Sequence, residues 1–179
     1  MAFAINKLGK GIALASLMAA AGTAYSATDG TLGATSTGSL DVRVEIADRV
    51  QISGLDDIDL GTYSGSGDLD GSDAFCVYRN GTGGYEVTIS SPQADDGAFR
   101  LRSGDEFIAY SVTFNDEAEI TGGSAVNSGD KLAGTGSATS VTCGNGSNAS
   151  LGVSIAAVAL QAAPTGVYTD TITLLVEPN

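Results

Sequence analysis

The chain has 179 residues, a length that suits one domain, and its 25 Gly with no Trp and no His favour many short strands over helices. Its formal net charge of −13 excludes nucleic acid and anionic membrane surfaces as partners, because both require a basic face. Serine or cysteine hydrolase chemistry lacks its usual histidine base, so an enzyme is not expected. A carboxylate pair that cleaves sugars stays open as an alternative.

Residues 1–26 have the features of a secretory signal peptide. Lys7 and Lys10 precede an apolar run at 12–21 that is too short to span a bilayer, and Ala24 and Ser26 are the small residues that a signal peptidase reads. We therefore expect export, with cleavage after Ser26 or one residue later. No second hydrophobic span follows, so membrane insertion of the mature chain is not expected.

Cys76 and Cys143 both lie in the part of the chain that is expected to be exported. An even cysteine count in an oxidising compartment predicts one disulfide. Closing a loop of this length would stabilise the fold by about 4 kcal/mol. A metal or redox pair is the alternative, but it would lack both a His partner and a CxxC spacing.

The mature chain is predicted to begin with a weak strand. Residues 27–38 are small and polar, and Leu32, Ala34 and Ser36 alternate there with equally small neighbours. Such a segment has too little apolar area to hold itself on its own domain. The same parity continues through larger residues, which predict the first strand of a domain over 39–179: Leu40, Val42, Val44 and Ile46.

Further apolar or alternating runs predict strands at 50–52, 74–78, 85–89, 99–102, 108–114, 141–143, 151–155 and 166–176. Between them we expect an acidic loop at 56–73, a hairpin turn at 80–84, a polar stretch at 115–139 and a loop with a helical turn at 158–164. Seven or more short strands with no convincing helix predict an all-β, antiparallel β-sandwich.

The acidic run Asp68–Asp73 has some likeness to a calcium-binding loop. An EF-hand loop needs Gly at its sixth position and Glu at its twelfth, and neither is present here. We expect a plain acidic turn, with a calcium site as the open alternative.

The last predicted strand, 166–176, is apolar on one face through Tyr168, Ile172, Leu174 and Val176. No later strand is available to pair with it, and an open strand edge invites another chain. Placing the tail of one molecule beside the last strand of the next would cover both, in a contact that propagates into a fibre. A complete sandwich with a disordered tail is the alternative.

The closing residues Gly166–Thr173 resemble the G-x-Y-x-D-x-[IV] signature that ends chaperone–usher pilins, especially the archaic, spore coat protein U-like branch. Phe75–Tyr78 and Asn80–Thr88 resemble the central cysteine strand and hairpin of that branch. With the signal peptide, the resemblance extends over essentially the whole chain.

This resemblance implies an incomplete immunoglobulin-like sandwich, completed by a donor strand from a neighbouring identical or homologous subunit. A periplasmic chaperone would lend a strand until an outer-membrane usher exchanges it for the next subunit's tail. The donor residues would be Leu32, Ala34 and Ser36 within 27–38. The groove would be lined by Leu40, Val42, Val44, Ile172, Leu174 and Val176.

The function implied is that of a structural pilus subunit at the cell surface that supports adhesion or biofilm formation, without catalysis or cofactor. The alternative is a secreted, self-contained β-sandwich that binds carbohydrate or calcium.

Overall fold

The structure is a computed structural model that describes residues 26–81, 83–119, 122–135 and 140–179, so the predicted signal peptide lies outside it except for Ser26. The chain divides into two units, Met1–Glu45 and Ile46–Asn179. The larger unit contains β1 (Val50–Ser53), β2 (Leu69–Arg79), β3 (Tyr85–Ser90), β4 (Phe99–Ser103), β5 (Glu106–Asn115), β6 (Ser124–Val126), β7 (Lys131–Gly134), the 3₁₀ turn η1 (Cys143–Asn145), β8 (Ala149–Ile155), α1 (Ala157–Ala162) and β9 (Thr173–Pro178). None of the described helices is both long enough and apolar enough to cross a membrane.

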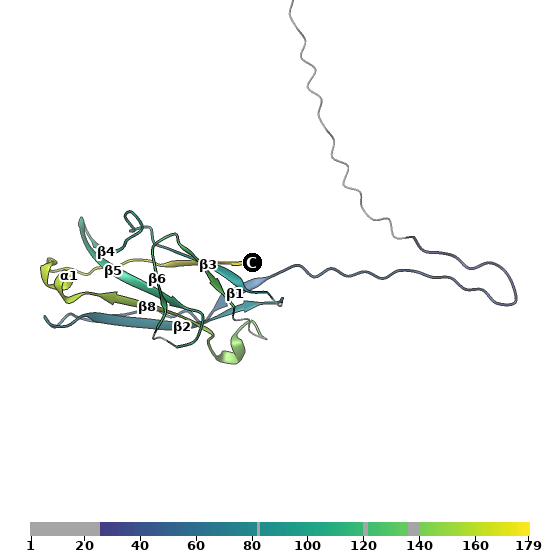
Figure 1. Cartoon of the computed structure of the whole chain (residues 1–179), viewed down its shortest axis with the longest axis horizontal. Coiled ribbons are helices and arrows are strands. Elements are labelled where there is room, and N and C mark those ends of the chain that lie inside the picture. Colours follow the sequence, from purple (N-terminus) through teal and green to yellow (C-terminus); the bar gives the residue numbers. More distant parts are fainter. Residues whose placement is uncertain (1–25, 82, 120–121, 136–139) are drawn as a thin grey trace, which may run out of the picture. The chain divides into compact units, whose positions relative to one another are not determined.

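The strands of the larger unit pair antiparallel and form two sheets (Figure 1). One sheet has the order β1-β2-β8-β5-β4, with β6 added to β5, and the other has the order β7-β3-β9. The long β2 and β8 pair from Leu69 with Ile155 to Phe75 with Ala149. β2 and β8 therefore form the centre of the larger sheet, and β9 lies at an edge of the smaller one.

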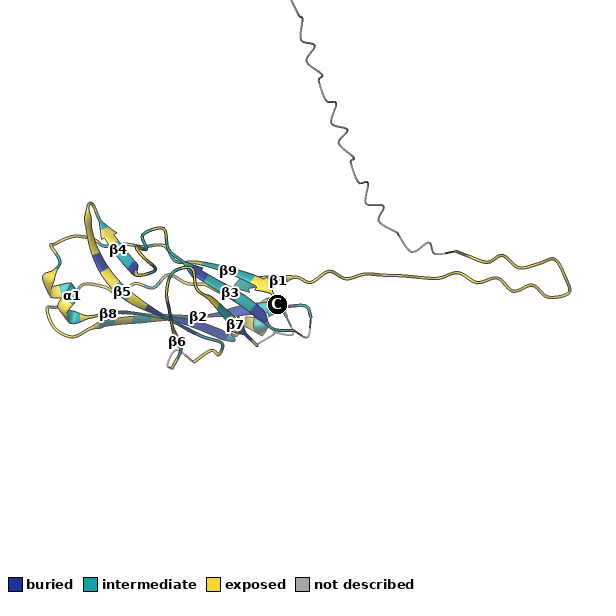
Figure 2. Cartoon of the chain, turned by 45° about the horizontal axis from the view of Figure 1, so that its top comes forward, coloured by how far each residue is buried: buried dark blue, intermediate teal, exposed yellow. Residues whose placement is uncertain are grey.

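The core lies between the two sheets (Figure 2). In β3, Tyr85, Val87 and Ile89 are fully buried while the residues between them are half-buried. Phe75 of β2 and Phe114 of β5 enter the same core from the larger sheet. A period of two of this kind turns one face of each strand towards the core. The predicted all-β, antiparallel sandwich is confirmed.

Several predicted elements are present with small shifts of their ends. β4 and β5 form a hairpin, with Ser103 paired to Glu106 at its turn. The helical turn expected within 158–164 is α1. The predicted disulfide is formed between Cys76 and Cys143, with the two Cα atoms 5.8 Å apart, and it joins β2 to η1.

The hairpin predicted at 80–84 is wrong. β2 pairs with β1 and β8, whereas β3 pairs with β7 and β9, so the two strands belong to different sheets. Glycine and asparagine allow a chain to reverse, but they do not determine which strands pair afterwards. Because Phe75 and Val77 of β2 and Tyr85 and Val87 of β3 are all buried, the reversal places two apolar faces against one another across the core.

Three other boundaries differ from the prediction. β2 begins at Leu69, so the end of the expected acidic loop is strand, fixed by its pairing with β8. Residues 141–143 lead into η1 instead of forming a strand, and Cys143 has a φ of 49°, which a strand does not contain. β6 and β7 occupy the stretch expected to be polar loop, where Val126 is buried and Leu132 half-buried.

The first strand predicted at 40–46 is also corrected. Leu40, Val42 and Val44 belong to no strand and are 71%, 89% and 82% exposed. The larger unit starts at Ile46, and its first strand is β1 at Val50. An alternating sequence fits a strand, but it forms one only where a partner strand and an apolar surface are available to it.

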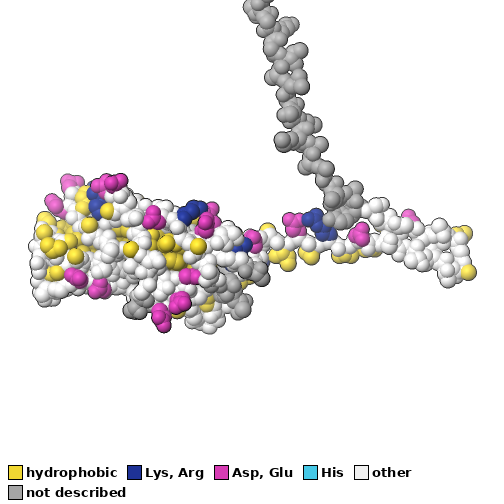
Figure 3. Space-filling view, viewed as in Figure 1, with side chains coloured by type: hydrophobic (Ala, Val, Ile, Leu, Met, Phe, Trp, Pro, Cys, Tyr) yellow, Lys and Arg dark blue, Asp and Glu magenta, His cyan; other side chains and the backbone are white. Residues whose placement is uncertain are grey.

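In the N-terminal unit the described residues are 26–45. Thr28 and Ser39 form an antiparallel bridge, in which each N–H donates to the other's carbonyl at 2.8 and 2.9 Å. Leu32 lies in the bend between them and is fully exposed. Figure 3 shows hydrophobic side chains along one edge of the extended part of the chain. This unit thus presents apolar side chains that its own described residues do not cover.

Candidate functional site

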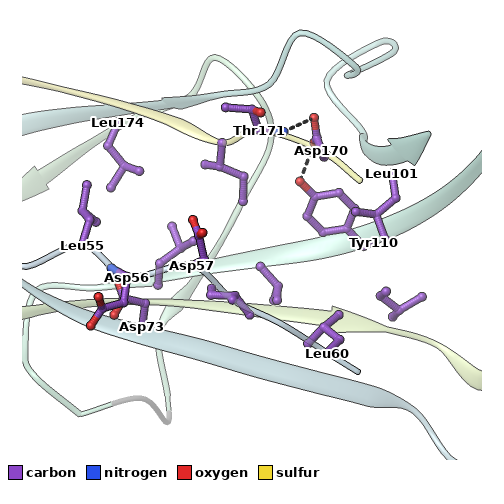
Figure 4. Close-up of a pocket in the computed structure, with 15 residues that line it drawn as sticks. Leu55, Asp56, Asp57, Leu60, Asp73, Leu101, Tyr110, Asp170, Thr171 and Leu174 are labelled. Carbon is purple, nitrogen blue, oxygen red and sulfur yellow. Dashed lines mark hydrogen bonds between the residues drawn. The ribbon is translucent and has the colours of Figure 1, made fainter. Parts of the chain in front are cut away.

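An open groove of about 340 Å³ lies beside the last strand (Figure 4). One wall is residues 170–174, which lead into β9, and the other is residues 55–60. Leu55 and Leu174 lie across from one another, and Tyr110 lies below Asp170 at the opposite end. The other apolar lining residues come mostly from β8: Leu101, Leu151, Val153 and Ile155. Asp73 of β2 adds a carboxylate to the lining.

β9 is an edge strand along this groove. It pairs with β3 from Thr173 with Ser90 to Pro178 with Tyr85, and no described strand pairs with its other side. An edge of this kind presents N–H and C=O groups that are able to form a ladder with a further strand. The groove thus combines an apolar floor with a backbone edge that accepts hydrogen bonds and donates them.

The wall at 55–60 is held closely over β2. The Asp56 N–H donates to the Asp73 carboxylate at 3.0 Å. Ile58 and Leu60 lie over Gly71, where a Cβ would come within 2.5 Å of both side chains. Any larger residue at this position would force the Ile58 and Leu60 side chains to move away from the strand.

Sequence reasoning identifies Ile58 and Leu60 as apolar anchors of the acidic loop but does not place them in the groove. The available signal was the i, i+2 spacing of Ile58 and Leu60, which puts both side chains on one face of an extended segment. The plain acidic turn expected at Asp68–Asp73 is wrong: Asp68 accepts a hydrogen bond from the Ala157 N–H at 2.7 Å, and the residues after it are strand β2. Among the described residues, no cluster of three or more His, Cys, Asp or Glu is placed to hold a metal ion.

Asp170 fixes the end of the groove. Its carboxylate accepts hydrogen bonds from the Ser91 hydroxyl at 2.6 and 2.7 Å, from the Tyr110 phenol at 2.6 Å and from the Thr171 N–H at 2.7 Å. Hydrogen bonds to an ionised acceptor are stronger than neutral ones. Because Ser91 follows β3 and Tyr110 lies in β5, this carboxylate ties the last segment to both sheets.

The chain changes sheets at this point. Thr169 exchanges two backbone hydrogen bonds with Arg102 of β4, at 2.9 and 3.0 Å, and from Thr173 onward the chain pairs with β3. Asp170 is therefore the residue of the closing signature that holds the crossing in place. Tyr168, another residue of the signature, donates from its hydroxyl to the Pro164 carbonyl at 3.0 Å.

The environment of Tyr110 keeps its phenol protonated. Burial raises the pKa of Tyr110 well above its ordinary value, and the hydrogen bond to Asp170 and the negative charge of that residue raise the pKa further. The phenol therefore remains a hydrogen-bond donor at neutral pH. This end of the groove is polar, in contrast to its apolar floor.

The structure brings together part of the groove that the sequence predicted. Ile172 and Leu174 line it, while Val176 lies farther along β9 and packs against the core. Leu40, Val42 and Val44 are not in its walls. They lie in the N-terminal unit, exposed, as do the expected donor residues Leu32, Ala34 and Ser36. Whether the groove accepts a strand stays a prediction.

The exposed residues Leu40, Val42, Val44 and Ile46, called here the apolar edge, share one parity. Ile46, the first residue of the larger unit, is 74% exposed. Charged residues alternate with them, and Arg43 pairs with Glu45 at 2.6 Å. In extended backbone this pattern gives one apolar and one charged side.

No protein-family model and no curated protein matches the sequence. Two solved structures resemble the fold. One is a chaperone–tip adhesin complex of CFA/I fimbriae biogenesis, with a TM-score of 0.52 and 18% identity over 74% of this chain. The other is the CsuC–CsuE chaperone–tip adhesion subunit pre-assembly complex from the archaic chaperone-usher Csu pili of Acinetobacter baumannii, with a TM-score of 0.49 and 18% identity over 80% of this chain.

The present chain spans only 41% and 44% of the length of the two matched chains. At this identity, the likeness to the CFA/I complex shows the fold, an immunoglobulin-like antiparallel β-sandwich. Nothing about partners or activity follows from it directly.

Proposed function

We propose that the protein is a structural subunit of a surface pilus, in which a segment of one molecule adds as a strand to the groove beside β9 of the next. The observation that carries this proposal is an apolar groove with an open strand edge in the same chain as an exposed alternating segment. Strand addition supplies a backbone ladder, and alternate side chains fill the groove. A contact between two different surfaces repeats from copy to copy and builds a fibre.

The apolar edge, Leu40 to Ile46, is the donor that fits best. Full burial of a Val, Leu or Ile side chain contributes about 1.5–3 kcal/mol. The apolar edge offers four such side chains, whereas the segment expected from the sequence offers only Leu32 among small residues. The donor residues proposed here are therefore Leu40, Val42, Val44 and Ile46 in place of Leu32, Ala34 and Ser36.

The donor segment is slightly longer than the groove. Each residue of an extended strand advances the chain by about 3.3 Å, so 40–46 spans roughly 20 Å. The groove walls, 55–60 and 170–174, would span roughly 16 and 13 Å in extended backbone, so the groove would hold most of the donor segment. The charged residues between the donor side chains would then face solvent, which avoids placing a charge in the groove.

Export and assembly would follow the chaperone–usher route. Both resembling structures are described as chaperone–adhesin complexes, which supports a periplasmic chaperone that covers the groove of this subunit before assembly. An outer-membrane usher would then exchange that strand for the donor of the next identical or homologous subunit. The resulting pilus at the cell surface would support adhesion or biofilm formation.

Engineered cysteines in the full mature chain test directly the joint between subunits, which is the contact of the donor segment 40–46 with the groove of the next molecule. Val42→Cys or Val44→Cys is combined with Leu174→Cys, and the matched control combines the same donor cysteines with Leu175→Cys, on the opposite face of β9. Under mild oxidation we expect a ladder of disulfide-linked oligomers for one of the Leu174 pairs and none for the Leu175 pairs.

Two other results are distinguishable. A cross-linked monomer without a ladder would mean that a molecule fills its own groove. No cross-link from a stable monomer would mean that the sandwich is complete, and the secreted carbohydrate- or calcium-binding alternative would then be favoured.

A further inference from the structure

The residues directly after the apolar edge are fixed to the end of β2 by one asparagine. The Asn80 side chain accepts a hydrogen bond from the Arg49 N–H at 2.7 Å and donates one to the Ala47 carbonyl at 2.9 Å. The Asn80 N–H also donates to the Arg49 carbonyl, at 3.1 Å. Residues 47–49 are thus held at both their ends by a single side chain and its backbone.

Arg79 holds the middle of the same segment. Its guanidinium is 8% exposed and pairs with the Asp48 carboxylate at 3.1 Å. The other terminal nitrogen donates to the carbonyls of Asn179, at 2.9 Å, and Gly84. Since Asn179 directly follows β9, this one side chain joins the segment 47–49 to the end of the strand that forms the groove.

We infer that Arg79 and Asn80, together with residues 47–49, form a rigid unit, called here the fixed base. The fixed base stiffens the joint between successive subunits of the fibre. The inference rests on the function proposed above. The donor pattern ends at Ile46 and the fixed segment begins at Ala47, so no free residue lies between them. Each free residue would add two soft dihedrals and would let the joint bend.

The fixed base also connects the two joints of one subunit. The incoming donor strand would pair with β9, and the outgoing donor strand begins at Ile46. Arg79 contacts residues next to both, Asn179 after β9 and Asp48 after Ile46. Tension along the fibre would therefore pass through a short path at this end of the domain, with the buried Arg79 side chain at its centre.

The test uses Asn80→Ala in the full mature chain, with Asn148→Ala as its matched control. Asn148 also makes two side-chain hydrogen bonds to backbone on β2, with the Val77 N–H at 2.8 Å and the Val77 carbonyl at 3.0 Å. Both variants lose the same kind and number of bonds, and only Asn80 contacts 47–49. Amide hydrogen exchange and the persistence length of fibres in electron micrographs are measured for each.

We expect Asn80→Ala to speed exchange at the Arg49 amide on the order of tenfold, as for the loss of two ordinary hydrogen bonds. Its fibres should form in normal yield and bend more than those of the wild type and of Asn148→Ala. Asn80→Asp, which keeps the acceptor for Arg49 but loses the donor to Ala47, should fall between the two. Asp48→Asn removes only the exposed partner of Arg79 and gives a second test if Asn80→Ala does not fold.

Equal persistence lengths for Asn80→Ala and Asn148→Ala fibres would overturn the inference, even with faster exchange at Arg49. Unchanged exchange at Arg49 would show that 47–49 is not held by Asn80. If the wild type forms no fibres, the proposed function fails instead, and the stiff joint fails with it. The exchange data would still report the state of residues 47–49 in that case.

Discussion

The Tyr110 phenol donates a 2.6 Å hydrogen bond to Asp170 at the polar end of the groove. Tyr110 belongs to β5 in the larger sheet, and Asp170 lies where the last segment crosses to β3 in the smaller one. This contact therefore fixes the distance between the two sheets beside the groove. It also gives Asp170 a structural role in this chain.

Removing the carboxylate at this position should destabilise the fold. Asp170→Ala leaves the Tyr110 and Ser91 hydroxyls without their acceptor, which costs about 1–3 kcal/mol for half-buried polar groups. Urea unfolding of the variant and the wild type measures this difference. The control is Asp105→Ala, whose side chain is fully exposed and should change the unfolding free energy by less than about 0.5 kcal/mol. Equal effects at the two positions would contradict the role of Asp170.

The pKa shifts of the fully buried Tyr85 and the half-buried Tyr110 predict a loss of stability at alkaline pH. Burial, followed by hydrogen bonds to Asp170 and Asp116, raises the pKa of Tyr110 and of Tyr85 in the folded protein. In the unfolded chain a tyrosine ionises near pH 10, about its ordinary pKa. The stability from these groups is thus fully present below about pH 10 and is lost as the pH rises from there towards the folded pKa.

Absorbance titration of tyrosinate gives the measurement for this prediction. We expect the wild type to retain late-ionising phenols until it unfolds, and Tyr110→Phe and Tyr85→Phe each to remove one of them. A Tyr110→Phe variant with the full late phase would show that Tyr110 is not shielded in solution.

The sequence predicted the sandwich well wherever one strand face meets the core. Tyr85, Val87 and Ile89 are buried, and Ile172 and Leu174 are half-buried against the core, as their period of two requires. Such positions depend on local alternation and on burial, and both are visible in the residues themselves. The disulfide followed from cysteine count and compartment alone.

The choice of partner for each strand, and whether an alternating segment forms a strand at all, were not predictable in the same way. The turn at 80–84 predicts a reversal, yet the choice of sheet for β3 depends on contacts with β7 and β9, far away in sequence. Residues 40–46 have the pattern of a strand, but whether they pair depends on a surface that the pattern does not specify. Ile58 and Leu60 were recognisable as apolar anchors of a loop, but their place in the groove depends on packing over β2 that the sequence does not specify.

A charge inside the groove should stop assembly. Leu55 and Leu175 are the same residue type with similar exposure, 51% and 55%, but Leu55 lines the groove and Leu175 lies on the outer face of β9. Leu55→Asp would place an unpaired carboxylate against the incoming strand, which costs several kcal/mol, whereas Leu175→Asp stays in water. Ile172→Asp and Leu174→Asp should act as Leu55→Asp does. Fibre yield by sedimentation and microscopy is the measurement, and equal yields for Leu55→Asp and Leu175→Asp would contradict the groove assignment.

Two substitutions of exposed residues distinguish between the two candidate donor segments, 40–46 and the segment that contains Leu32. Val42 is 89% exposed and Leu32 fully exposed, so neither Val42→Asp nor Leu32→Asp should change the unfolding free energy of the monomer by more than about 0.5 kcal/mol. Val42→Asp should nevertheless abolish polymerisation, measured by light scattering, because its charge would enter the neighbour's groove. Leu32→Asp should polymerise normally if 40–46 is the donor. Loss of polymerisation with Leu32→Asp and retention with Val42→Asp would return the donor role to Leu32, Ala34 and Ser36, and would leave the exposure of 40–46 to be explained by another partner.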